Sequence, residues 1–349
     1  MTSLRVFVLV VVGLACLPVN AAHAADTVTV DTFVRAETDT MMARYVAQGG
    51  FGKFLHIRGM TPVDKQNVIR MNRDTLYSAG VFDLTTPVTI VKPDHGKRYQ
   101  SMQVINQDHS TLMVEQAAGT FTLTREKVGT RYAIVLLRTF ADPNDPVDMR
   151  EAMALQDRVQ VQQAAAGSFE VPQWDGTSLE TVRSAVNVLA ATKSDTSGFF
   201  GDKAKLNPID HLLGTAYGWG GLPRYAAVYQ AGMPQLNDGK TPYALTVREA
   251  PVDGFWSITV YNAKGFMEPD ALDRYSVNNV TAKPNADGSV TVHFGGDAGA
   301  SNYLPITTGW SYVVRMYGPR KPVVDGTWKF PEAQPVRVSA ASSMRSLGD

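Results

Sequence analysis

The sequence contains a single cysteine, Cys16, which lies in an N-terminal stretch with the form of a signal peptide. Arg5 precedes an apolar run over residues 6–18, and the small residues at 22 and 24 fit a cleavage site. Cleavage after Ala24 would remove the cysteine. The exported chain would then have no disulfide, no thiolate nucleophile and no cysteine metal ligand.

Long hydrophobic runs are also missing beyond the predicted signal peptide. No later stretch reaches 18 apolar residues, so no membrane anchor is expected after cleavage. Gly13 stands where lipoprotein signals usually carry leucine, so lipidation of Cys16 is not expected. The sequence therefore predicts a periplasmic or secreted protein, and it leaves the oligomeric state open.

Neither sign of charge is in excess, because 33 Lys and Arg residues face 33 Asp and Glu residues. Cleavage would remove one basic residue, Arg5, and leave a net charge of about −1. Such a chain lacks the basic surface of a nucleic-acid or anionic-membrane binder. A chain of 349 residues exceeds what one hydrophobic core usually serves, so two domains are expected.

Several catalytic motifs are absent as well. No glycine-rich phosphate loop follows a predicted strand, and no Gly-x-Ser-x-Gly elbow occurs. No two histidines share helical or strand spacing, so neither a metal site nor a cofactor is predicted. Ser78 could act as a nucleophile only if a base reaches it. A carboxylate pair for glycoside hydrolysis stays open, because spacing in the chain does not give spacing in the fold.

Hydrophobic periodicity predicts helices at the start and in the middle of the chain and strands elsewhere. Alternation predicts strands through residues 75–138, separated by turns at 94–96, 118–119 and 128–129. Further strands are predicted at 243–248, 254–261, 289–294 and 311–317. The predicted helices cover residues 28–49, 148–163, 178–191, 207–214 and 222–229.

The C-terminal strands divide their side chains between an apolar face and a polar face. The second face carries four polar or aromatic residues: Tyr261, His293, Arg315 and Tyr317. One interpretation is the solvated outer face of a sandwich. The other is a ligand-binding concavity, where a few polar groups lie among aromatic rings.

The densest polar stretch is residues 70–78, which lead into a predicted strand. In an extended chain Arg73 and Tyr77 share a face, and an arginine beside a tyrosine hydroxyl suits a carboxylate or an oxyanion. Arg73, Asp74 and Tyr77 are therefore the candidate catalytic residues. The alternative is a structural network between Arg73 and Asp74 at the edge of the sheet.

The sequence resembles a bacterial two-domain family. Residues 72–78 (NRDTLYS), 82–84 (FDL), 98–99 (RY) and 214–221 (GTAYGWGG) resemble domain of unknown function 1254. Residues 253–261 (DGFWSITVY), 273–276 (DRYS), 302–305 (NYLP) and 325–328 (DGTW) resemble its partner, domain of unknown function 1214. Tyr303 departs from the tryptophan usual at that position. The resemblance implies two jelly-roll-like sandwiches and frequent export, and it implies no settled activity.

These observations together predict an α+β protein of two antiparallel β-sandwich, jelly-roll-like domains with flanking and connecting helices. The expected parts are a signal peptide (1–24), an N-terminal helix and sandwich (25–146), a helical connector (147–236), a C-terminal sandwich (237–340) and a tail (341–349).

The predicted partner is a small molecule bound in a polar cleft between the domains. Besides the catalytic candidates, the predicted binding residues are Asn72, Arg138, Trp256, Tyr261, Arg274 and Asn302. The leading hypothesis is an enzyme, with a hydrolase as the class considered first, that acts on a carboxylate- or ester-bearing molecule, with Asp74 orienting Arg73. The alternative is a non-catalytic envelope protein that binds a glycan or a protein through a sheet face.

Overall fold

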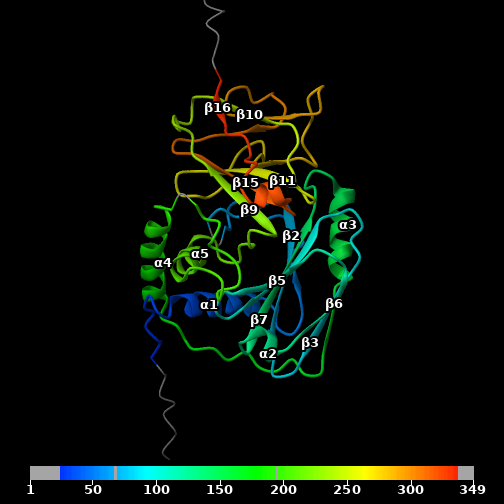
Figure 1. Cartoon of the computed structure of the whole chain (residues 1–349), viewed down its shortest axis with the longest axis vertical. Coiled ribbons are helices and arrows are strands. Elements are labelled where there is room, and N and C mark those ends of the chain that lie inside the picture. The colour runs from blue at the N-terminus through cyan, green and yellow to red at the C-terminus, as the bar shows by residue number, and fades with distance from the viewer. Residues whose placement is uncertain (1–23, 67–68, 194, 337–349) are drawn as a thin grey trace, which may run out of the picture.

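The computed structural model describes residues 24–66, 69–193 and 195–336, and Figure 1 shows its two halves stacked along the longest axis. The predicted signal peptide falls outside the described residues except for Ala24, and the predicted tail lies wholly outside them. Within the described residues, no helix combines the length and the apolar composition that a membrane span requires.

The described residues form six helices and sixteen strands. The helices are α1 (Phe33–Ala47), α2 (Arg125–Val128), α3 (Pro146–Asp157), α4 (Gly176–Ala190), α5 (Pro208–Gly218) and α6 (Lys321–Val324). The strands of the first half are β1 (Leu55–His56), β2 (Thr75–Asp83), β3 (Val88–Lys92), β4 (Gln100–Asn106), β5 (Thr111–Glu115), β6 (Gly119–Leu123), β7 (Tyr132–Phe140) and β8 (Gln160–Gln163). Those of the second half are β9 (Ala227–Gly232), β10 (Tyr243–Val247), β11 (Trp256–Tyr261), β12 (Ser276–Asn278), β13 (Val290–Phe294), β14 (Tyr303–Leu304), β15 (Ser311–Tyr317) and β16 (Gln334–Pro335).

The first domain is a sandwich of a five-stranded sheet, β1-β2-β7-β4-β5, and a three-stranded sheet, β6-β3-β8. Its core lies between the sheets and includes Phe82, Ile90, Val104 and Val135, all fully buried. The other face of the larger sheet packs under α1 through Met42, Val81 and Ile134. Strand β7 is therefore covered on both sides, which explains its nearly continuous apolar sequence.

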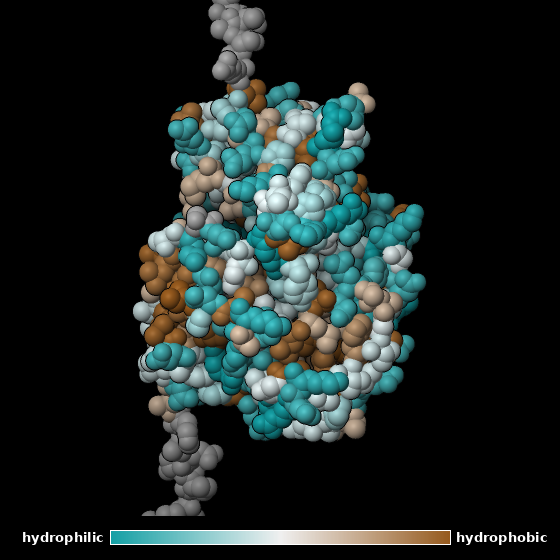
Figure 2. All heavy atoms as spheres, in the orientation of Figure 1, coloured by the Kyte–Doolittle hydropathy of each residue, from teal (hydrophilic) through white to brown (hydrophobic). Residues whose placement is uncertain are grey.

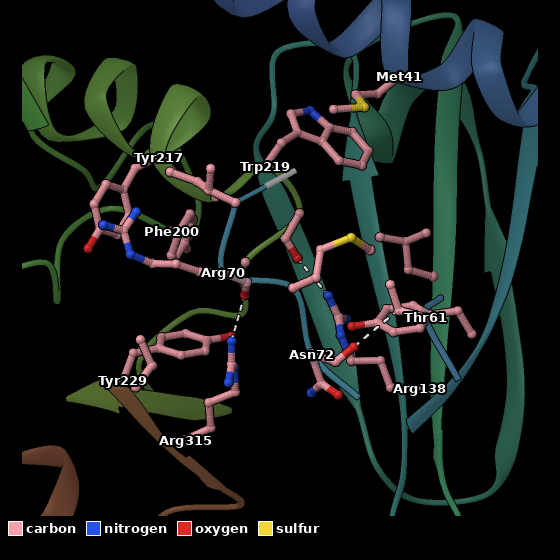
Figure 3. Close-up of a pocket in the computed structure, with 18 of the residues that line it drawn as sticks. Met41, Thr61, Arg70, Asn72, Arg138, Phe200, Tyr217, Trp219, Tyr229 and Arg315 are labelled. Carbon is pink, nitrogen blue, oxygen red and sulfur yellow. Dashed lines mark hydrogen bonds between the residues drawn. The ribbon is translucent and has the colours of Figure 1, made fainter. Parts of the chain in front are cut away.

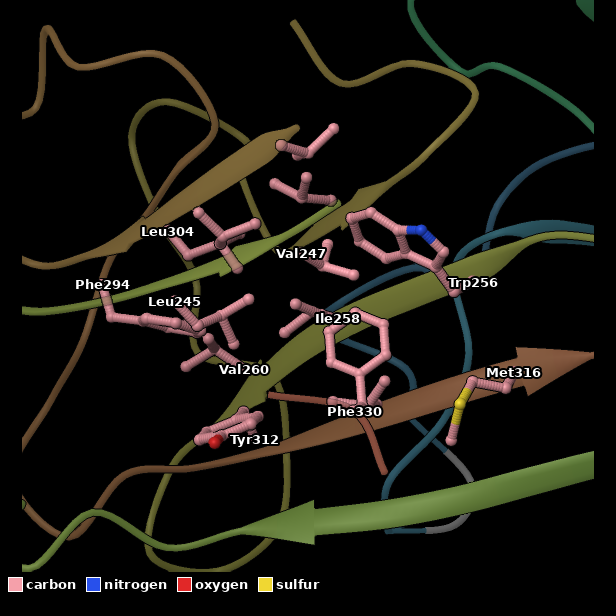
Figure 4. Close-up of a cluster of buried hydrophobic side chains, with 14 of the residues drawn as sticks. Leu245, Val247, Trp256, Ile258, Val260, Phe294, Leu304, Tyr312, Met316 and Phe330 are labelled. Carbon is pink, nitrogen blue, oxygen red and sulfur yellow. The ribbon is translucent and has the colours of Figure 1, made fainter. Parts of the chain in front are cut away.

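The second domain is a sandwich of the sheets β14-β13-β10-β16 and β12-β11-β15-β9. Figure 4 shows Trp256, Ile258 and Val260 pointing into its core together with Phe294 and Tyr312. Every second residue of β11 enters this core, as strand alternation predicts. The predicted α+β fold of two sandwiches is confirmed.

The opposite face of β11 and β15 is buried against the first domain rather than solvated. Ser257, Thr259 and Arg315 are each at most 4% exposed. The solvated-face interpretation is therefore wrong for this sheet. His293 lies on β13 in the other sheet, so it does not join Tyr261, Arg315 and Tyr317 as expected.

Two predicted helical boundaries and one predicted helix are wrong. Helix α3 ends at Asp157, and β8 pairs with β3 where the helix was expected to continue. Residues 222–229 form no helix, and the last of them begin β9, which pairs with β15. The first helix begins at Phe33 instead of residue 28.

Helix α4 buries one face and exposes the other. Leu179, Val186 and Ala190 are buried, whereas Leu189 is 57% exposed. Figure 2 shows hydrophobic side chains gathered on the surface over this helix, where Val188 and Leu189 are exposed.

Candidate functional site

A cavity of about 470 Å³ lies where the two domains and the connector meet. Its walls come from α1, the loops before β2, the strands β2 and β7, the segment after α5, and the strands β9 and β15. The volume falls within the range of roughly 300–1,000 Å³ typical of small-molecule sites. Figure 3 shows its lining residues from both domains.

Arg138 projects from the middle of β7 and is 6% exposed. Its Nη1 donates to Gln103 Oε1 (2.8 Å), and its Nη2 donates to the carbonyl of Gly220 (2.7 Å). The guanidinium carbon lies 5.4 Å from the centroid of the Tyr77 ring. These neutral contacts use two of the five N–H donors, so the group is fixed in place with donors to spare.

Arg315 projects from β15 of the second domain and is 4% exposed. It donates to Thr259 Oγ1 (3.0 Å), to the Tyr261 hydroxyl (2.6 Å) and to the carbonyl of Arg70 (2.6 Å). The dashed line in Figure 3 marks the contact with Arg70. Arg315 therefore holds the loop that brings Arg70 into the cavity.

Arg70 is held in a left-handed backbone conformation, with φ of 57°. Its N–H donates to the carbonyl of Gly265 (2.8 Å), and its carbonyl accepts from Arg315, so the second domain holds the backbone on both sides of this residue. Such strain persists only where the surroundings hold it. The guanidinium packs 4.2 Å from the centroid of the Tyr217 ring, and Nη1 is buried without a partner in the described structure.

The cavity is positively charged, because its described lining includes four arginines and no aspartate or glutamate. Within the described residues, every arginine ion pair involves an arginine other than Arg70, Arg138 and Arg315. The fourth lining arginine, Arg44, is exposed at the rim.

Asp74 lies behind the lining and acts on Arg315 through its charge. It is 1% exposed, and its Oδ1 accepts from the Ser276 hydroxyl (3.1 Å). Burial raises the pKa of Asp74, and its hydrogen bonds and Arg315 offset this only in part. Asp74 is therefore a weak counter-charge for the arginines.

Five tyrosines also line the cavity, and burial keeps three of them neutral. Burial raises the pKa of Tyr45 to about 12 and raises the pKa of Tyr229 and Tyr317 above the ordinary value. These three phenols stay neutral at neutral pH and can donate a hydrogen bond to a ligand. The Tyr317 hydroxyl contacts the amide of Asn72, which joins the first domain to the second.

Apolar side chains cover the end of the cavity nearest α1. Figure 3 shows Met41 and Trp219 at one end of the site and Arg315 and Asn72 at the other. Trp219 Nε1 donates to Thr38 Oγ1 (3.1 Å) on α1, so the indole leaves only its ring for the cavity. Leu136, which packs with Trp219, adds to this apolar wall, and Phe200 lines the cavity beside Tyr217 and Tyr229.

His109 supports the cavity wall from behind. Its Nε2 accepts from the backbone N–H of Gly220 (2.9 Å), which assigns the proton to Nδ1, 2.9 Å from Thr215 Oγ1. The ring lies 5.6 Å from that of Trp219 at an angle of 24°. Burial lowers the pKa of His109 to about 3, so the ring is neutral. His109 thus helps to position Gly220, whose carbonyl accepts from Arg138.

Three of the predicted site residues line the cavity: Asn72, Tyr77 and Arg138. Arg73 and Asp74 lie outside the lining. Arg73 donates to the carbonyl of Thr61 (3.1 Å) and faces Asp273 at 3.6 Å, and Asp74 bonds Ser276 instead of Arg73. The expected orientation of Arg73 by Asp74 is therefore not seen.

The predicted residues of the second domain lie outside the lining. Trp256 is in the core of its own sandwich. Tyr261 lies behind Arg315, and its hydroxyl donates to the carbonyl of Met71 (2.8 Å). Arg274 donates to the carbonyl of Ala298 (2.8 Å), and Asn302 donates to the carbonyls of Lys283 and Thr291, so both serve loops of the second domain.

Arg70 and Trp219 line the cavity but were not predicted as site residues, although both lie in stretches with distinctive motifs. Arg315 was predicted to lie on a polar face, without a connection to Arg138. Ser78 does meet a base, because His56 Nδ1 lies 2.8 Å from its Oγ. However, Ser78 is 1% exposed and also contacts Gln156 of α3 (3.1 Å), so it faces away from the cavity.

Across residues 24–66, 69–193 and 195–336, no group of three or more His, Cys, Asp or Glu side chains is arranged to hold a metal ion.

Comparison with known proteins identifies the class. The family model described as protein of unknown function DUF1254 matches residues 51–163, and that of DUF1214 matches residues 224–321. Together the matches cover more than half of the chain. The chain therefore belongs to the two-domain family that carries both domains, as the resemblance predicted.

Two solved structures share the fold. One is the VPA0106 protein from Vibrio parahaemolyticus, which is 17% identical with a TM-score of 0.64, covering 88% of this chain and 98% of its own. The other is an uncharacterised protein from Burkholderia cenocepacia, 14% identical with a TM-score of 0.51, covering 88% and 87%. At these identities the likeness extends to the fold alone. No curated protein matches the chain.

Proposed function

We propose that this protein binds a small organic anion in the cavity between its domains. The observation that carries the proposal is the set of three arginines, Arg70, Arg138 and Arg315, on a lining whose described residues include no acidic side chain.

The energetic argument rests on burial. A buried charge costs several kcal/mol unless it is paired, and arginine does not lose its proton in proteins. Arg138 and Arg315 are almost fully buried, with neutral hydrogen-bond partners only. A carboxylate that accepts from their remaining N–H groups would supply the missing charge through strong, charge-assisted hydrogen bonds.

The lining favours binding over hydrolysis. Its described residues include no carboxylate, imidazole, amine or thiol, so tyrosine and threonine hydroxyls are the general-base or nucleophile types that remain at the cavity surface. The catalytic roles predicted for Arg73 and Asp74 gain no support from their positions. The sheet-face alternative gains none either, because Tyr261 and Tyr317 are at most 2% exposed.

A thermal-shift comparison of matched acids and neutral molecules tests the proposal. At about 100 times its dissociation constant, a ligand should add about 2.7 kcal/mol of stability and raise Tm by roughly 5 °C. We expect carboxylic acids to raise Tm and their alcohols or amides not to. Arg138→Gln should reduce the shift by half or more, whereas the exposed Arg248→Gln should retain it. Equal shifts with acids and alcohols would contradict the proposal.

A further inference from the structure

We infer that the anion is a monocarboxylate with an apolar body, bound with its acid group deep in the cavity and its body against the α1 end. The inference rests on the proposed function and adds the class of ligand and its orientation. It is carried by the separation of polar and apolar lining residues along the cavity.

The deep end is the polar one. Asn72, Arg138, Arg315 and Tyr317 line the cavity, and all four are buried, none more than 8% exposed. They come from both domains and are joined by the contact of Asn72 with Tyr317. A carboxylate here would receive guanidinium and phenol donors together, as a buried anion requires.

The α1 end offers no buried charged donor to a second acid group. Trp219 donates its N–H to Thr38, Met41 and Leu136 have no donor, and the one buried donor on α1 is the neutral phenol of Tyr45. An ionised group placed there would lose its hydration without a charged partner. A hydrocarbon chain or an aryl ring instead gains free energy with each methylene that it buries. The remaining polar lining residues at this end, Arg44 of α1 and Gln48 after it, are exposed at the mouth and already in water.

A series of acids of increasing chain length separates two statements: that the ligand has an apolar body, and that the cavity binds an organic anion at all. Binding of butanoate, hexanoate, octanoate, octan-1-ol and octanedioate to the purified protein would be measured by isothermal titration calorimetry. We expect Kd to fall roughly tenfold for each two methylenes added. We also expect octanoate to bind at least tenfold more tightly than octan-1-ol and octanedioate.

Any other result of this titration series would overturn one specific part of the inference or the proposed function. Acids that bind with the same Kd at every length would overturn the apolar body and leave the anion site standing. Tighter binding of octanedioate than of octanoate would overturn the single acid group. Equal affinity of octanoate and octan-1-ol, or no binding of any acid, would overturn the proposed function itself.

A variant tests the orientation. Met41→Gln keeps the size of the side chain but makes the α1 end polar, so octanoate should bind about tenfold more weakly while butanoate, held at the deep end, is unchanged. Met233→Gln, at a methionine that is 76% exposed, is the matched control. Equal weakening of both acids by Met41→Gln, with Tm unchanged, would place the short acid at the α1 end and contradict the orientation.

Discussion

At the scale of a single residue, the proposed anion binding depends most on Arg138, because it is a buried cation whose hydrogen-bond partners are neutral. We predict that Arg138→Gln weakens binding of a carboxylate at least tenfold, corresponding to a lost charged hydrogen bond of about 1.5–3 kcal/mol. Tm without ligand should change little, because the variant removes a desolvated charge together with its two hydrogen bonds. Calorimetry and thermal unfolding measure the two effects. A large loss of Tm with unchanged affinity would show a structural role.

His109 gives a second prediction at this scale, and it concerns pH. The native pKa of about 3 lies below the value of about 6.5 expected in the unfolded chain. Between these values the unfolded state binds the proton and the native state does not. Stability is therefore complete above pH 6.5 and falls as the pH drops toward 3, by up to about 1.4 kcal/mol per pH unit.

Urea unfolding of wild type and His109→Gln at pH 7, 6 and 5 measures how much the neutral His109 ring contributes to the free energy of unfolding. The difference between the two in the free energy of unfolding should shrink as the pH falls. His293→Gln, on the other sheet of the second domain, serves as the control. A difference that stays constant with pH would contradict the assignment of a neutral, buried ring.

At the scale of elements, α5 is positioned by a close approach at Gly214. A Cβ at this position would lie 2.3 Å from the carbonyl oxygen of Phe199. Gly214→Ala should therefore destabilise the protein by about 1–3 kcal/mol, because backbone must move to make room. Gly176→Ala at the start of α4 meets no atom within 4 Å and should be neutral. Similar free energies of unfolding for the two variants would argue against tight packing of α5.

The elements also show what the sequence could predict. The strands β3, β4, β7, β10, β13 and β15 follow from alternation or from a continuous apolar run. The four-residue strand β8 could not be separated from the helix before it, because it carries glutamine at three of its four positions. Its state is decided by pairing with β3, about 70 residues earlier in the sequence.

At the scale of the whole molecule, an aromatic cluster joins the domains. The Phe255 ring lies 5.3 Å from Tyr99 and 4.9 Å from Phe140 of the first domain, and 4.4 Å from Tyr317 of the second, between ring centroids. Phe255→Ala should cost about 3–5 kcal/mol and split unfolding into two calorimetric transitions. Phe330→Ala, in the core of the second domain, removes a ring of the same size away from the junction.

The comparison of the two variants tests whether the aromatic cluster joins the domains. Phe330→Ala should destabilise the second domain without weakening ligand binding at temperatures well below its transition. Phe255→Ala should lower the stability of the protein and also weaken ligand binding. Loss of binding in both variants, with a single transition in each, would mean that the domains behave as one unit whatever joins them.

The predicted site residues that line the cavity come from one polar stretch of chain, apart from Arg138 on β7. Asn72 and Tyr77 lie in a single polar segment, and both reach the cavity. The contact of Arg315 with the carbonyl of Arg70 joins residues 245 positions apart, so no local pattern could pair them. Trp256 and Tyr261 were chosen for their chemistry, but the docking of the second sheet decides which of its residues face the cavity.

The most direct test of the central claim is a crystal structure of the protein with octanoate. We predict the carboxylate within hydrogen-bond distance, roughly 2.7–3.2 Å, of guanidinium nitrogens of Arg138 and Arg315, with the alkyl chain along Trp219 toward Met41. Octanoate bound elsewhere on the protein, or lying in the cavity with its acid group at the α1 end, would contradict the account.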